Sequence, residues 1–268
     1  MLAIMQDRSG SLQLLNKVPE VTLIFWIIKT LSTTVGETFA DFLNVTLSLG
    51  LNITSIVMGV LLVAALAVQI RLSRYVATAY WTCVVLISVV GTLISDNLVD
   101  KFHVPLATSS SLFAVILAAA FLAWYAVERT LSVHTIVSRR REFFYWGAIL
   151  FTFSLGTSFG DLMAEKLALG YALSALMFAT FIGLVTAAYY GLRLNAILAF
   201  WLAYILTRPL GASMGDLLSQ PIHSGGLGFG TSATSAAFLV TIVFFVIHLS
   251  GQQARQQRAA LVDAEAGE

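Results

Sequence analysis

A glutamate and four aspartates stand inside stretches of the sequence that are otherwise apolar. Glu37 and Asp41 are four residues apart, so their carboxylates would share one face of a helix. The other aspartates of this kind are Asp96, Asp161 and Asp216. A carboxylate removed from water must be protonated, paired or hydrated, and hard cations prefer oxygen ligands. All five are therefore candidates to bind a cation or a proton, and Glu37 with Asp41 are the first candidates for a metal.

The four aspartates each end one copy of a repeated pattern, (Phe or Tyr)-Trp-x9-Gly-x4-Asp. Four such copies indicate an internally duplicated fold. The motif glycines are explained without any ligand by close contact between helices, which we favour over a ligand role. The motif aspartates are explained without any ligand if each lies at a helix end, solvated or capping the next turn. The motif tryptophans are Trp26, Trp81, Trp146 and Trp201, and the motif glycines are Gly36, Gly91, Gly156 and Gly211.

The composition is that of a membrane protein. Of 268 residues, 58% are hydrophobic and 11% are charged, whereas an ordinary soluble domain is about 25% charged. The net charge of +1 offers no field that would attract nucleic acid. A single cysteine, Cys83, provides neither a disulfide nor a thiolate metal site. We expect a lipid bilayer as the partner and no cofactor.

Eight apolar runs are long enough to cross a bilayer, which takes about 20 residues. The sequence thus predicts an all-α polytopic membrane protein with eight transmembrane helices, arranged as four parallel two-helix repeats. We expect each repeat to form a helical hairpin. The runs lie near residues 21–42, 51–70, 76–97, 107–128, 143–163, 171–192, 195–217 and 231–249.

The third and fourth copies of the pattern keep the spacing of the first and second, which predicts two four-helix halves. We place an N-terminal segment at 1–20, the halves at 21–134 and 135–250, and a C-terminal tail at 251–268.

Positive charges in the loops predict the orientation. Eleven Lys or Arg residues fall on the side of the termini and two, Lys101 and Lys166, on the other. Because Lys and Arg are retained on the cytoplasmic side, both termini should be cytoplasmic. With two spans per repeat, all four repeats point the same way around an axis along the membrane normal.

The motif tryptophans would then be anchors at the cytoplasmic interface. At a rise of about 1.5 Å per residue, the glycines lie roughly 15 Å deeper and the aspartates roughly 22 Å deeper. Glu37, next to the first glycine, would be near the midplane.

Two basic residues lie in the same runs and are candidates for charge compensation. Lys29 is three residues past Trp26, and we expect its ammonium to extend to the headgroups. Arg208 lies deeper, beside Pro209, and is either the counter-ion of a carboxylate or a gating charge.

The repeat resembles a family of bacterial integral membrane proteins built from four tandem copies of a two-span repeat of unknown function. The resemblance runs from about Val18 to Ser250 and is carried by TTVGETFAD, GTSFGD and RPLGASMGD. In the second copy, the corresponding segment VVGTLISD shares only the glycine and the aspartate with all three. The resemblance implies this architecture and a bacterial inner-membrane location, but no substrate.

From these residues we expect a membrane transporter of a cation, with a divalent metal favoured, through a carboxylate-lined site between the two halves. Protons would compete for the carboxylates, because burial favours the protonated form, so proton coupling is an option. Two alternatives stay open: a carrier of a small organic solute held by Arg208 and Glu37, and a non-transporting membrane scaffold. No catalytic motif is present, so we do not expect an enzyme.

Overall fold

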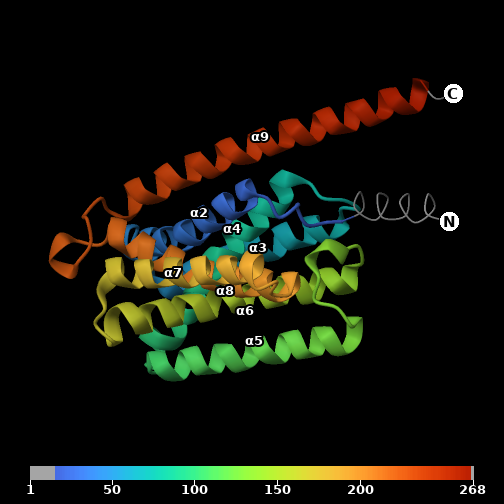
Figure 1. The fold of residues 1–268 in the computed structure, drawn as a ribbon. Helices are drawn as coiled ribbons and strands as arrows, with labels where there is room; N and C mark the ends of the chain where they lie inside the picture. The colour runs from blue at the N-terminus through green and yellow to red at the C-terminus, as the bar shows by residue number, and fades with distance from the viewer. Residues whose placement is uncertain (1–15, 267–268) are drawn as a thin grey trace.

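In the computed structural model, which describes residues 16–266, the chain forms helices and connecting turns and no strand (Figure 1). The bounds agree with the predicted runs within a few residues, except that the last helix continues into the expected tail. The long helices are α2 (Leu23–Asp41), α3 (Gly50–Arg71), α4 (Ala77–Asp96), α5 (Leu106–Glu128), α6 (Arg139–Asp161), α7 (Gly170–Gly191), α8 (Ala196–Ser219) and α9 (Thr231–Ala266).

Within the described part of the chain, seven of these helices are long and apolar enough to cross a membrane. The helix that falls short is α2, since Lys29, Glu37 and Asp41 lower its mean hydropathy. The all-helical fold is confirmed and the chain has the composition of a membrane protein, while the eighth span stays a prediction.

The four helices that carry the motif form a closed inner ring. Each of α2, α4, α6 and α8 packs against the next, and α8 packs against α2. Between 56% and 61% of the apolar windows of α4, α6 and α8 is buried, against 11% to 22% for α3, α5, α7 and α9. The latter four are therefore outer helices.

Each outer helix packs on the inner helix of the following repeat. Thus α3 lies on α4, α5 on α6, α7 on α8, and α9 returns to α2. The two helices of one repeat contact each other far less, so the expectation of two-helix hairpins is wrong. The ring contacts between the two halves are as extensive as those within them, and the boundaries proposed for the halves stay predictions.

The motif glycines allow the inner helices to approach closely. A Cβ added to any of them would lie within 3.0 Å of a residue on the next helix of the ring. That residue is always the one three positions before the next motif glycine. This regular contact is what close helix packing through small residues requires. The pairs are Gly36 with Ser88, Gly91 with Phe153, Gly156 with Arg208, and Gly211 with Thr33.

Residues four apart on the inner helices share a face and form successive layers of four across the ring. We name the layers by residues that they contain. The aromatic layer lies eleven residues before the motif glycine, the lysine layer seven before it, the arginine layer three before it, and the glutamate layer one residue after it. All sixteen residues are buried. They are Phe25, Tyr80, Tyr145 and Phe200; Lys29, Val84, Ile149 and Tyr204; Thr33, Ser88, Phe153 and Arg208; and Glu37, Thr92, Thr157 and Ala212.

The ring is closed at the aromatic end. The hydroxyl groups of Tyr80 in α4 and Tyr145 in the neighbouring α6 are 2.5 Å apart. Beside this layer, Trp81, Trp146 and Trp201 are at most 4% exposed and pack against aromatic neighbours. The sequence predicts them as anchors at the cytoplasmic interface, whereas edge-to-face packing holds these three side chains inside the core. Trp26 alone is half-buried.

The residues just before α2 are fixed to other segments at the aromatic end. Lys17 forms a buried ion pair with Glu142, Nζ to Oε2 2.7 Å, and its ammonium also donates to the carbonyl of Ile70 at 3.0 Å. Asn16 donates to the carbonyl of Val133 at 3.3 Å. The residues before α2 thus tie the α3–α4 turn to the α5–α6 connection. Lys17 is one of the positive charges that the sequence assigns to a loop, and it is buried here.

We predict that Gly91→Ala lowers the free energy of unfolding by ~1–3 kcal/mol, because its Cβ would collide with Phe153. The matched control is Gly147→Ala in α6, where nothing lies within 4 Å and alanine favours the helix. Thermal unfolding in detergent compares the two variants. Equal melting temperatures would contradict the close-contact role of the motif glycine.

Candidate functional site

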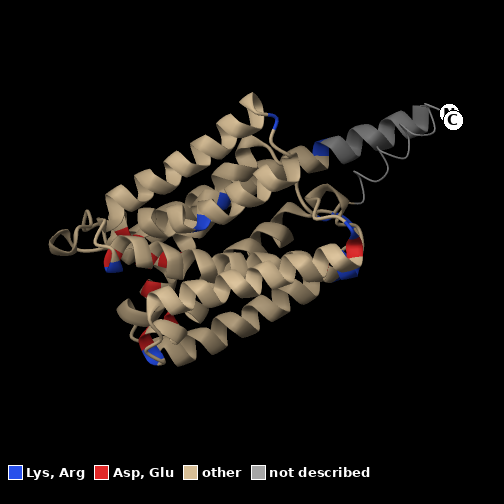
Figure 2. Ribbon diagram, turned by 60° about the horizontal axis from the view of Figure 1, so that its bottom comes forward, with Lys and Arg blue, Asp and Glu red and all other residues tan. Residues whose placement is uncertain are grey.

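The acidic residues of the motif lie at the end of the inner ring opposite the aromatic layer. Most acidic positions lie at that end of the bundle (Figure 2). Three motif aspartates are followed at once by a single π-helical turn, a feature common at functional sites. The fourth copy differs, because α8 continues in α-helical form past Asp216 to Ser219. The π turns are η1 (Phe42–Thr46), η2 (Asn97–Lys101) and η4 (Leu162–Lys166).

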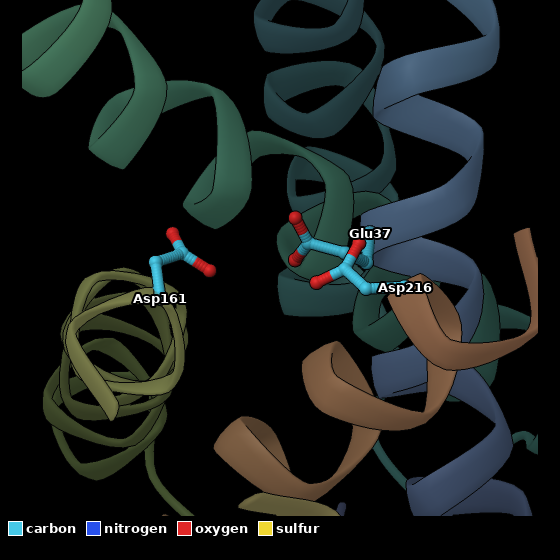
Figure 3. Close-up of side chains that lie close together, drawn as sticks. All are labelled: Glu37, Asp161 and Asp216. Atoms are coloured by element: carbon cyan, nitrogen blue, oxygen red, sulfur yellow. The ribbon is translucent and has the colours of Figure 1, made fainter. Parts of the chain in front are cut away.

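Three carboxylates from three repeats converge at this end. One oxygen from each of Glu37, Asp161 and Asp216 lies within 4.8 Å of the other two. In Figure 3 they project from α2, α6 and α8, and the carboxylates of Glu37 and Asp161 point toward each other. Glu37 is 6% and Asp216 7% exposed, and Asp161 is half-buried. Like charges this close need a cation or a proton between them, so this carboxylate trio has the chemistry of a cation site.

The guanidinium of Arg208 lies beneath the trio and is fully buried. Its Nη2 pairs with Glu37 Oε2 at 3.0 Å and also donates to the hydroxyl groups of Thr157, at 2.5 Å, and Thr92. Its Nη1 donates to the carbonyl of Thr33 at 2.9 Å. Glu37, Thr92 and Thr157 are the same layer position in three repeats, so one guanidinium bonds to three sides of the ring. Of the two interpretations left open for Arg208, the counter-ion of a carboxylate fits this geometry.

The two remaining motif aspartates lie outside the trio. Asp41 accepts a long hydrogen bond of 3.5 Å from Gln220, and both Asp41 and Asp96 are half-buried. The metal pair expected from sequence was Glu37 with Asp41. The structure instead brings Asp161 and Asp216 to Glu37.

Lys29 does not reach the headgroups, so that expectation is wrong. Its side chain is fully buried in the ring, with Nζ 4.3 Å from the ring centroid of Phe153 and 4.2 Å from that of Tyr204. The expectation failed because it considered only how far Lys29 lies from Trp26 along the helix, and not that Lys29 is on the face of α2 turned into the ring.

Hydroxyl groups connect the inner and outer helices next to the trio. Ser158 is 2.6 Å from Ser95 and 2.8 Å from Ser109, oxygen to oxygen, and Ser235 donates to Thr38 at 2.8 Å. These bonds join α6 to α4 and α5, and α9 to α2. The hydroxyl groups at the start of the outer helices therefore serve packing in these two places.

Sequence reasoning missed four residues around the two buried cations: Thr92 and Thr157 as acceptors for Arg208, and the rings of Phe153 and Tyr204 against Lys29. Their distance from the motif glycines in the sequence could have revealed them. Each lies a multiple of four residues away from the other residues of its helix that face the centre of the ring.

Fold and site together define a helical membrane protein in which four repeats enclose a charged axis. Four segments of the chain match the family model described as Repeat of Unknown Function (DUF347). The protein belongs to this family, which confirms the resemblance seen in the sequence. Neither a curated protein nor a solved structure matches the chain. The matched segments are residues 24–75, 79–130, 144–194 and 199–254.

We predict that Glu37 and Arg208 are energetically coupled. Glu37→Gln leaves a buried guanidinium without its anion, which costs about 3–5 kcal/mol in comparable buried pairs. Adding Arg208→Gln should then cost less than it does alone. Thermal unfolding of both single variants and the double variant gives the coupling energy, expected on the order of 0.5–3 kcal/mol. Strictly additive effects would contradict a direct pair, and Asp96→Asn, outside the trio, is the control for loss of a carboxylate.

Proposed function

We propose that the protein is a membrane transporter of a cation, with a divalent metal favoured, and that the cation binds at the carboxylate trio. One observation carries the proposal: three carboxylates from separate repeats lie within 4.8 Å of one another. Packing alone gives no reason to bring these like charges together. Oxygen-only ligands suit hard divalent cations, which accept carboxylates together with water.

The proposal includes α2 as an eighth span. This helix completes the inner ring between α4 and α8, and α9 covers it from outside. Its buried residues Lys29, Thr33 and Glu37 contact the inner helix α8, and Thr38 accepts a hydrogen bond from Ser235 of α9. The chain also enters the bundle at the end where α9 leaves it (Figure 1), which requires an even number of crossings. The excess of Lys and Arg at that end makes it the cytoplasmic side, and the family resemblance favours a bacterial inner membrane.

Arg208 competes with the cation in this scheme. While the site is empty, the guanidinium holds Glu37 and offsets part of the negative charge of the trio. A cation that binds Glu37, Asp161 and Asp216 takes over that role and weakens the hold of Arg208. Protons neutralise the same oxygens, so cation binding should weaken as the pH falls and protons become the candidate coupling ion.

The axis itself is not an open route for a cation. Beyond the trio lie two buried positive groups, on Arg208 and Lys29, and then the aromatic layer. Fixed positive charge in a pore repels cations. The cation must therefore enter from the aspartate end, and its release on the other side requires the ring helices to rearrange. These features favour a carrier over a channel.

Of the two alternatives, the organic-solute carrier needs Arg208 to bind a substrate carboxylate. The terminal nitrogens of this guanidinium already donate to Thr33, Glu37, Thr92 and Thr157. The scaffold explains the tight glycine contacts and leaves the trio without a role. Both fit the site less well than a cation does.

We predict uptake of a divalent cation by proteoliposomes that contain the purified protein, measured with an entrapped metal-sensitive dye for Mg2+, Mn2+, Ca2+ and Zn2+ in turn. Asp216→Asn removes one trio ligand and should reduce uptake at least tenfold. Asp96→Asn is the matched control, because it changes the same repeat position outside the trio and should retain most of the uptake.

Equal loss in both variants would show that the trio is not the site. No flux of any cation, with no cation raising the melting temperature, would contradict the transporter. Arg208→Gln separates the organic-solute carrier, which would lose binding of its solute, from the cation carrier, whose apparent cation affinity should rise.

A further inference from the structure

Four buried polar groups in the middle of the inner ring have no hydrogen-bond partner among the described residues. They are Lys29 Nζ, Tyr204 Oη, Ser88 Oγ and Arg208 Nε. All four residues belong to the lysine and arginine layers, and each is less than 1% exposed. Buried polar groups are normally satisfied by protein, water or a ligand, so a cluster of this size indicates that a binding partner belongs there.

The partner must be an acceptor. An ammonium and a guanidinium Nε–H can only donate, and the two hydroxyl groups are able to donate as well. The aromatic faces beside Lys29 attract its charge, but they do not replace a strong acceptor for its N–H groups.

The charge balance points to an anion. Lys29 and Arg208 lie against the same ring, that of Phe153, with Lys29 Nζ 4.3 Å and Arg208 Cζ 5.6 Å from its centroid. Within the described chain, Arg208 pairs with Glu37, and Lys29 has no carboxylate within 4.0 Å. The carboxylate nearest to the ring centre thus pairs with Arg208 and not with Lys29. In the described part of the chain the ammonium of Lys29 has no direct counter-ion, and an isolated charge away from water is costly.

We propose that the ring binds a small monovalent anion, of the chloride class, held by Lys29 and Arg208 between the lysine and arginine layers. A monovalent ion matches the single uncompensated charge, and a spherical one can be satisfied by the few donors present. A phosphate or sulfate brings more charge and more acceptor oxygens than these donors match. This anion site does not use the carboxylate trio, so it goes beyond the proposed cation site.

The test is the thermal stability of the purified protein in potassium chloride against potassium gluconate at equal ionic strength. Chloride should raise the melting temperature by several degrees in a saturable way, because a ligand of the native state stabilises it. Bromide should act similarly, and gluconate is too large. Lys29→Met keeps the length of the side chain, removes the charge and should abolish the chloride response. Lys101→Met is the matched control, since Lys101 is exposed at the aspartate end and its loss should leave the response intact.

A wild-type melting temperature that does not depend on chloride would overturn the proposal. A full chloride response in Lys29→Met would overturn it as well, by placing the anion elsewhere. If Lys29→Met does not fold, equilibrium binding of radioactive chloride to the wild type decides, with one ion per chain expected and none contradicting. Asp216→Asn should keep the chloride response while losing cation uptake, so the two sites fail independently.

Discussion

A guanidinium buried where four helices meet must be paired and hydrogen-bonded from every side, and much of this structure meets that requirement for Arg208. Glu37 supplies the opposite charge, and Thr92, Thr157 and the carbonyl of Thr33 accept from the two terminal nitrogens. The arginine also needs glycine at position 156, because any side chain there would collide with it. Desolvation makes the arrangement costly to break. The position of this one charge therefore constrains three repeats at once.

The four repeats share a backbone plan but not a chemistry. Each supplies an aromatic pair, a glycine in close contact and an aspartate, while the lysine, arginine and glutamate layers differ between the repeats. One layer holds Thr, Ser, Phe and Arg, and the next holds Glu, Thr, Thr and Ala. Such a division is typical of sites placed on a scaffold, where the fold persists and the site varies. The conserved plan builds the ring, and the variable layers create the carboxylate trio at one end and the buried cations in its middle.

Much of the fold follows from the sequence because apolar run length and repetition are local signals. The helix bounds, the parallel repeats and the packing glycines are such cases. The packing of one repeat against another is not a local signal. The sequence of α3 does not indicate that this helix packs on α4 rather than on α2. The surroundings of the tryptophans were also misjudged, since Trp81 resembles an interface residue in the sequence and packs against Tyr80 in a core in the structure. The choice of aspartates that lie beside Glu37 depends on the rotation of the helices about their axes and on the π turns. Neither can be predicted from the spacing of residues in the sequence.

The return of α9 to α2 makes the chain equivalent to four subunits that exchange their second helices and have been joined end to end. Four identical subunits around an axis must present the same residue four times, so such an assembly would place four arginines at the centre or none. Covalent linkage removes that restriction. A lone guanidinium, a single glutamate and one lysine can then occupy an axis that symmetry would otherwise fill with like charges.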